Sequence, residues 1–150
     1  MPKPVKPYIP QGSDPLIEKF ICCLMHSGKK SIARRVFWDA IEIVKTRTKD
    51  APLEVFQKAL LNATPLLEVR PKRVGGSVYQ VPVEVTPKRQ LSLSIRWMIG
   101  GARARKGIPM AQRLGLEFLD ASAGQGSAVK KKEDVLKMAQ ANKAFAHLAK

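Results

Sequence analysis

The clearest structural signal in this chain is the stretch LLEVRPKRVGGSVYQVPVEV, which spans residues 66–85. Valine recurs through it, and Gly75-Gly76 separates two runs that favour extended structure. A glycine pair between such runs is typical of the primed turn of a β-hairpin, because both positions need a positive φ. Pro71 and Pro82 would interrupt a central strand, but a ribbon of two strands has only edges. The stretch therefore predicts a two-stranded antiparallel hairpin.

The two ends of this hairpin differ in character. With a two-residue turn, Arg70 lies opposite Val81 and Lys72 lies opposite Tyr79. An apolar base is predicted to anchor the ribbon, and its residues are Leu67, Val69, Val83 and Val85. The tip is basic and rich in glycine and has little to bury, so we expect it to project from the body.

Amphipathic segments flank the hairpin, three before it and three after it. Each carries apolar residues at helical spacing. Two of them start with a capping residue followed by proline, a common way to begin a helix. The six predicted helices start at Asp14-Pro15, near residue 30, near Pro52, at Thr86-Pro87, at Pro109 and at Ser127. The last is expected to use Ser127 as its cap and to end at about His147.

The apolar stripes of these helices predict the core. The large residues on or beside the stripes include Phe20, Phe37, Phe56, Phe118, Trp38, Trp97, Ile32 and Leu53, with Val135, Met138, Phe145 and Leu148 on the last helix. The adjacent Cys22 and Cys23 lie in the first stripe and are predicted to pack at or near the core.

These elements define the expected fold class, which is mainly α. We expect a six-helix bundle with one protruding two-stranded antiparallel β-hairpin between the third and fourth helices. Residues 1–13 contain prolines at every second or third position and are predicted to form an extended basic arm. Residues 14–150 are predicted to form a single helical domain, with the hairpin at about 66–85.

The charge of the chain points to a polyanionic partner. The 150 residues include 27 Lys and Arg against 12 Asp and Glu, a net charge of +15. The surplus is uneven, with nine basic and two acidic residues between positions 66 and 107. A hydrophobic content of 45% is enough for a folded core. A folded domain with this surplus most simply binds nucleic acid.

Catalytic and metal-binding patterns are not found in the sequence. His26 and His147 are the only histidines and lie near opposite ends of the chain. Metal-ligand spacings and phosphate-binding glycine loops are absent. We therefore predict no enzyme, no catalytic residue, no metal and no cofactor. No apolar run approaches the length of a membrane span, and neither a membrane nor a homo-oligomer is expected.

Five clusters of basic residues are the candidate phosphate contacts. Arginine suits this role because its planar fork grips phosphate oxygens in pairs. Few aromatic residues are available to stack unpaired bases, so we expect recognition of the backbone and shape of a folded nucleic acid. The clusters are Lys29, Lys30, Arg34 and Arg35; Arg70, Lys72 and Arg73; Lys88, Arg89 and Arg96; Arg103, Arg105 and Lys106; and Lys130, Lys131, Lys132, Lys137 and Lys143.

Four ordered motifs resemble one family, ribosomal protein seven of the small subunit, bacterial type. They are GKKS at 28–31, RVGGSVYQVPVEV at 73–85, IRW at 95–97 with ARAR at 102–105, and AVKKKED at 128–134 with MA at 138–139 and ANKAFAH at 141–147. The resemblance covers about residues 14–148 in order and without large gaps.

The resemblance implies a structural protein of the small ribosomal subunit. It implies binding to the 3′ major (head) domain of small-subunit rRNA, nucleation of head assembly, and a place near the exit-site tRNA and the mRNA path. It adds Lys3, Lys6 and Asn142 to the rRNA contacts. It places the hairpin tip, Val74, Gly75, Gly76, Ser77 and Tyr79, towards the exit-site tRNA or a neighbouring protein. Small-subunit proteins nine and eleven are the implied neighbours, in a bacterial ribosome or, alternatively, an organellar one.

An architectural DNA-binding protein is the alternative. A helical body with a basic ribbon also suits wrapping of a DNA minor groove. Such proteins usually place an apolar wedge at the ribbon tip, and Val74-Gly75-Gly76-Ser77 is a weak wedge. The sequence therefore favours rRNA over DNA.

Overall fold

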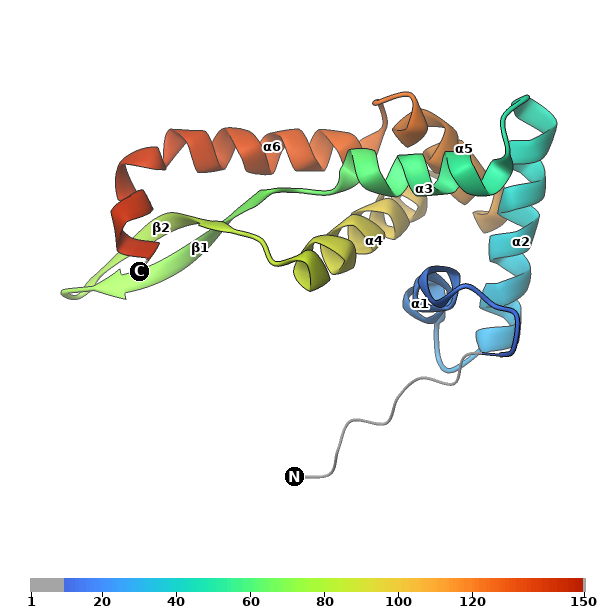
Figure 1. The fold of residues 1–150 in the computed structure, drawn as a ribbon, viewed down its shortest axis with the longest axis horizontal. Coiled ribbons are helices and arrows are strands. Elements are labelled where there is room, and N and C mark those ends of the chain that lie inside the picture. The colour runs from blue at the N-terminus through green and yellow to red at the C-terminus, as the bar shows by residue number, and fades with distance from the viewer. Residues whose placement is uncertain (1–9, 150) are drawn as a thin grey trace.

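The computed structural model describes residues 10–149, and its arrangement is drawn in Figure 1. Within that range the chain is mainly α, with the two-stranded hairpin between the third and fourth helices, as the sequence predicts. The elements are α1 (Pro15–Leu24), α2 (Lys30–Arg47), α3 (Pro52–Ala63), β1 (Leu67–Val74), β2 (Ser77–Glu84), α4 (Pro87–Ala104), α5 (Met110–Ser122), α6 (Ser127–Ala141) and the short 3₁₀ helix η1 (Lys143–Ala149). Most of the predicted arm, including Lys3 and Lys6, lies outside the described residues.

The predicted register of the hairpin is confirmed. Arg70 pairs with Val81 and Lys72 pairs with Tyr79 in an antiparallel ladder. Gly75 and Gly76 form the turn with φ values of 57° and 86°. Both values lie in the left-handed region that favours glycine, which explains why two glycines occupy this turn.

Four phenylalanines form the centre of the core. Phe20 of α1 has its ring centroid 5.6 Å from Phe37 of α2, 5.2 Å from Phe56 of α3 and 5.5 Å from Phe118 of α5. Each of the four side chains is essentially inaccessible to solvent. The rings meet mostly edge to face, a favourable geometry for aromatic pairs. The prediction that Phe20 and Phe37 belong to the core is confirmed.

The hairpin does not project alone, because the C-terminal part of the chain lies beside it. Figure 1 shows α6 running along the same side as the ribbon, with η1 crossing its strands. The Tyr79 ring centroid lies 5.2 Å from that of Phe145, and Lys72 Nζ donates to the Leu148 carbonyl at 2.5 Å. The expectation that the tip lacks support from its own chain is therefore wrong for Lys72 and Tyr79, which both contact η1. Beyond them, residues 73–78 are exposed.

The last helix is shorter than the sequence predicts. α6 ends at Ala141, whereas the prediction extended it to about His147. The Asn142 side-chain amide donates to the Met138 carbonyl at 2.8 Å, and the chain then tightens into η1. Such side-chain bonds compete with the helical backbone pattern. Phe145 consequently packs on the hairpin and not on the bundle as predicted.

Several predicted core residues lie at the surface. A helix at the edge of a bundle has neighbours on only part of its apolar stripe, so its outer residues remain exposed. The exposed fractions are 44% for Ile32, 45% for Trp38, 39% for Leu53 and 47% for Met138. Cys22 is half-buried and Cys23 is exposed, so the cysteine pair lies farther out than predicted. Among the described residues, no helix combines the length and apolar character needed to cross a membrane.

Candidate nucleic-acid interface

Three buried glutamates organise much of the basic surface. Glu18, Glu68 and Glu117 are 3%, 8% and 0% exposed. Burying a carboxylate is costly unless opposite charges and hydrogen bonds compensate for the lost water. Each of the three is compensated by basic residues that the sequence predicts to be nucleic-acid contacts. The positions of these basic side chains are therefore set by bonds within the protein.

Glu18 of α1 holds two cations of α2. Arg34 donates to both carboxylate oxygens of Glu18, at 2.6 and 3.0 Å, and Lys30 Nζ lies 3.1 Å from Oε2. Burial alone would raise the pKa of Glu18, but its bonds to Arg34 and Lys30 outweigh burial and hold this pKa below its usual value. Glu18 is therefore ionised at neutral pH, and it joins α1 to α2 beside the GKKS loop.

Glu68 of β1 lies between two arginines. Arg70 Nε donates to Glu68 Oε1 at 2.5 Å, and Arg89 Nε of α4 donates to Oε2 at 3.3 Å. Arg70 Nη2 also contacts Oε1. One carboxylate thus connects the base of the hairpin to the first turn of α4.

Glu117 of α5 caps the start of α6. The backbone N–H of Ala128 donates to Glu117 Oε1 at 3.0 Å. The predicted cap, Ser127, is instead the first helical residue, and Gly126 with a φ of 91° occupies the cap position without a side chain. A Cβ added at Gly101 would lie 2.8 Å from Glu117 Oε1, so α4 needs a glycine where it passes this carboxylate.

Arg105 balances the charge of Glu117. Its Nη2 lies 3.0 Å from Glu117 Oε2 and 2.5 Å from Asp120 Oδ2. Burial alone would lower the pKa of the Arg105 guanidinium, but its bonds to Asp120 and Glu117 outweigh burial and raise that pKa above its usual value. Arg105 therefore stays charged and fastens the end of α4 to α5.

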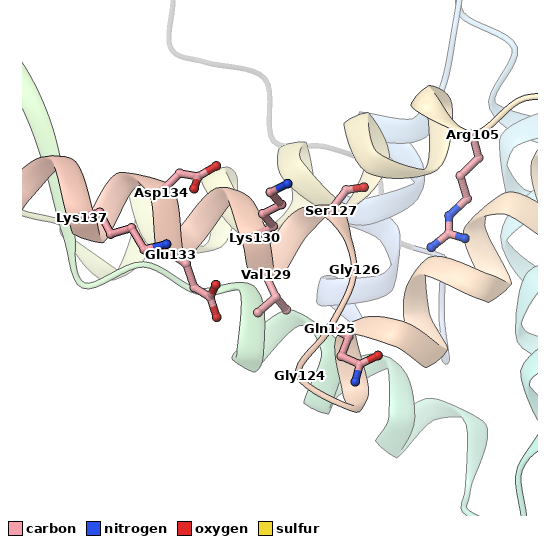
Figure 2. A pocket seen from close by; sticks show the side chains of 10 residues that line it. All are labelled: Arg105, Gly124, Gln125, Gly126, Ser127, Val129, Lys130, Glu133, Asp134 and Lys137. Carbon is pink, nitrogen blue, oxygen red and sulfur yellow. The ribbon is translucent and has the colours of Figure 1, made fainter.

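A polar hollow of about 480 Å³ opens beside this network. Figure 2 shows it between Arg105, the loop of Gly124, Gln125 and Gly126, and the first turns of α6. Lys130 and Lys137 share its lining with Glu133 and Asp134, so the signs of charge are mixed. No group of His, Cys, Asp and Glu suited to a metal ion occurs among residues 10–149.

Three predicted contact residues bond to backbone carbonyls of the protein. Lys72 binds the Leu148 carbonyl, as described above, and Arg103 Nη2 lies 3.3 Å from that of Leu24. Lys132 Nζ donates to the Asn62 carbonyl at 2.9 Å and so ties α6 to the end of α3. The cluster of residues 130–132 therefore divides into two exposed lysines and one anchored lysine.

The remaining predicted contacts lie mostly at the surface. Asn142 is half-buried and bonds to the Met138 carbonyl. In the described part of the chain, the exposed predicted cations with no carboxylate within 4.0 Å are Lys29, Arg35, Arg73, Lys88, Arg96, Arg103, Lys106, Lys130, Lys131, Lys137 and Lys143.

Cys23 lies beside two of these arginines. It shares a hollow of about 400 Å³ with Arg96 and Arg103 of α4. Burial raises the pKa of the Cys23 thiol, although the charges of Lys19 and Arg96 partly offset this effect. The thiol is therefore protonated at neutral pH and is a poor nucleophile.

The predicted contacts of the hairpin tip also include both exposed residues and one residue that supports the fold. Val74, Gly75, Gly76 and Ser77 are exposed, while Tyr79 is half-buried against Phe145. The first four are free to meet another molecule, whereas Tyr79 mainly supports the ribbon.

Sequence reasoning missed the three buried glutamates, which touch the predicted contacts without being contacts themselves. One signal was available for Glu68, because residues two apart in a strand share a face and Arg70 follows at that spacing. No comparable local signal marks Glu18 or Glu117.

The chain combines a helical body with a basic ribbon and with cations fixed by buried carboxylates. These features define a class of protein, the binder of a large polyanion such as nucleic acid. The particular family follows from comparison with known proteins. The chain belongs to the family described as ribosomal protein S7p/S5e, whose model matches residues 2–143.

Curated relatives agree with this assignment. Small ribosomal subunit protein uS7 of Dictyoglomus thermophilum is 55% identical over 132 residues, covering 88% of this chain and 85% of the relative. The uS7 proteins of Leptospira biflexa and Magnetococcus marinus are 54% and 50% identical, over 92% and 96% of this chain and 88% and 94% of theirs. The protein is a non-enzymatic structural constituent of the small ribosomal subunit and acts in translation.

Proposed function

We propose that this protein is a primary rRNA-binding protein of the small subunit, which binds the 3′ major (head) domain and nucleates assembly of the head. The observation that supports the proposal is the large number of exposed cations, most of which have no carboxylate within 4.0 Å in the described part of the chain. Glu18, Glu68 and Glu117 join α1 to α2, β1 to α4 and the end of α4 to α5, so the elements that carry these cations are held together before RNA binds, which lowers the cost of binding. The relatives named above are bacterial, which supports a bacterial ribosome over an organellar one.

The contacts follow from the chemistry of phosphate. Exposed lysines contribute charge, and arginines add paired hydrogen bonds to phosphate oxygens. We assign the rRNA contacts to the predicted cations, with Lys72 and Lys132 in mainly supporting roles because they are half-buried and bond to carbonyls of the chain.

A comparison of RNA with DNA tests this function. We expect the protein to bind a transcript of the head domain roughly a thousandfold more tightly than a DNA duplex of equal length at equal salt, because a fixed surface fits one folded shape. Competition titrations of the full chain would measure the ratio. Equal affinities would instead favour the architectural DNA-binding alternative.

We further propose that the protein lies near the exit-site tRNA and the mRNA path, with small-subunit proteins nine and eleven as neighbours, and that its hairpin tip contacts the exit-site tRNA or a neighbouring protein. The exposure of residues 73–78 supports a contact beyond the protein's own rRNA site. Tyr79 is assigned to support of the ribbon because it packs on Phe145.

Deleting the tip tests whether residues 73–78 serve an outside contact while the rest of the hairpin supports the fold. Removal of Arg73, Val74, Ser77 and Val78 leaves Gly75-Gly76 joining Lys72 to Tyr79, the next pair of the same type in the ladder. We expect a nearly unchanged melting temperature, because the removed residues are exposed and the contacts to η1 remain. Binding to head-domain rRNA should weaken only by the share of Arg73, whereas assembled subunits should retain exit-site tRNA less well.

A matched control is Arg73→Ala in the full-length hairpin, which removes the same charge and keeps the tip. If the deletion abolishes rRNA binding while Arg73→Ala does not, the tip is a primary rRNA anchor and the proposed division is wrong.

A further inference from the structure

The Arg70–Glu68–Arg89 group differs from the other ion pairs in its exposure. Glu68 is 8% exposed, but the side chains of Arg70 and Arg89 are 62% and 40% exposed. The cations held by Glu18 and Glu117 are only about a third exposed. The carboxylate is therefore hidden, while both guanidinium groups reach solvent.

Each arginine keeps free hydrogen-bonding capacity. A guanidinium group has five N–H donors in one plane. Arg89 uses its Nε towards Glu68, and Arg70 uses its Nε and one Nη2 hydrogen on a single carboxylate oxygen. Both groups can therefore grip a phosphate while they remain bonded to Glu68.

The group also spans two elements beside a concave surface. Arg70 belongs to β1 and Arg89 belongs to the first turn of α4. Because both arginines bond to Glu68, they lie at the junction of the hairpin and α4. Glu68, but neither arginine, lines a hollow of about 280 Å³ that also includes Trp97 of α4 and Val135 of α6.

We propose that Arg70, Glu68 and Arg89 form a preformed clamp for neighbouring phosphodiester groups of RNA, in which Glu68 is the positioning residue. The proposal rests on the proposed rRNA-binding function and names one site within it. Free arginine side chains lose conformational entropy when they bind a phosphate, and holding them in place beforehand reduces that cost.

The clamp proposal and simple electrostatics predict opposite changes in RNA affinity when Glu68 loses its charge. Replacing Glu68 by glutamine removes one negative charge and so raises the net charge of the chain above its present +15. If the arginines act only as point charges, RNA binding tightens. If Glu68 positions them, RNA binding weakens in spite of the added positive charge.

Glu68→Gln is therefore compared with Glu84→Gln. Glu84 lies on β2 of the same ribbon, is exposed, and has no ion pair with another described residue. We expect Glu84→Gln to bind head-domain rRNA as tightly as the unaltered protein or slightly more tightly. We expect Glu68→Gln to bind roughly tenfold more weakly, within the range for coupled neighbouring groups.

Two further measurements separate positioning from a general loss of structure. In Glu68→Gln, the slope of log affinity against log salt should become shallower by the amount that corresponds to about one phosphate contact. The melting temperature should stay unchanged. In a chain that already carries Arg70→Ala and Arg89→Ala, Glu68→Gln should no longer weaken binding, because the residues it positions are gone.

A second variant keeps the test decisive if Glu68→Gln fails to fold. Glu68→Asp keeps the charge but shortens the side chain, so it cannot reach both guanidinium groups, and it should also bind RNA more weakly. Binding of the folded Glu68→Gln variant as tight as that of Glu84→Gln would overturn the clamp. Failure of the unaltered protein to prefer head-domain rRNA would instead overturn the proposed function.

Discussion

Phe20→Ala is expected to lower the free energy of unfolding by about 3–5 kcal/mol, the usual cost of replacing a buried phenylalanine by alanine. Phe20 contacts Phe37, Phe56 and Phe118 and is inaccessible to solvent. Its removal leaves a cavity where α1, α2, α3 and α5 meet, and no single helix can move to fill it while keeping its other neighbours. Urea unfolding of the free protein measures the change.

Phe145→Ala is the matched control. This ring lies outside the core and contacts Tyr79 of the hairpin. Its loss should cost less than that of Phe20, because the half-buried ring loses less buried area, in addition to about 0.5–1.5 kcal/mol for the aromatic pair itself. An unfolding free energy of Phe20→Ala equal to that of Phe145→Ala would contradict the central role of the four-ring cluster.

A steep loss of RNA affinity with salt is the second large effect. Binding to head-domain rRNA should weaken by roughly 10³–10⁵ between 50 and 200 mM salt if six to ten phosphates are neutralised, because each neutralised phosphate releases condensed cations from the RNA. The exposed cations of α2, α4 and α6 are numerous enough for such a count. Titrations at several salt concentrations give the slope directly.

The first turns of α6 supply a sharp comparison within this measurement. Lys130→Ala with Lys131→Ala removes two exposed lysines and should reduce the slope by roughly 0.7–0.9 for each phosphate that the protein no longer neutralises. Lys132→Ala removes a lysine that bonds to the Asn62 carbonyl, so it should affect stability more than the slope. Equal slope changes per lysine in the two variants would show that Lys132 also binds RNA.

Local sequence patterns predicted the elements well, because each depends on residues close together in the chain. The glycine pair set the turn of the hairpin, and the turn length then set the pairing of Arg70 with Val81. Asp14-Pro15 marked the start of α1, where Asp14 Oδ1 accepts a bond from the Leu16 N–H at 2.8 Å. The aromatic residues on the apolar stripes marked the four-ring core.

Other features could not be predicted because they depend on neighbours far apart in the sequence. Glu18 is 16 residues from Arg34, and Glu68 is 21 residues from Arg89. The cap of α6 comes from Glu117, although Ser127 satisfies the local pattern. Phe145 satisfies the helical spacing of α6, but the hairpin offers its ring a partner in Tyr79.

The sequence by itself determined which segments are helices, where the hairpin turns, and that the protein presents a strongly basic surface. Only the tertiary structure decided which basic residues reach solvent and which hold the protein together, as the contrast between Lys131 and Lys132 shows. The physical reason is that charge and periodicity are properties of the chain. The partner of a charged group is decided by how the helices and the hairpin pack.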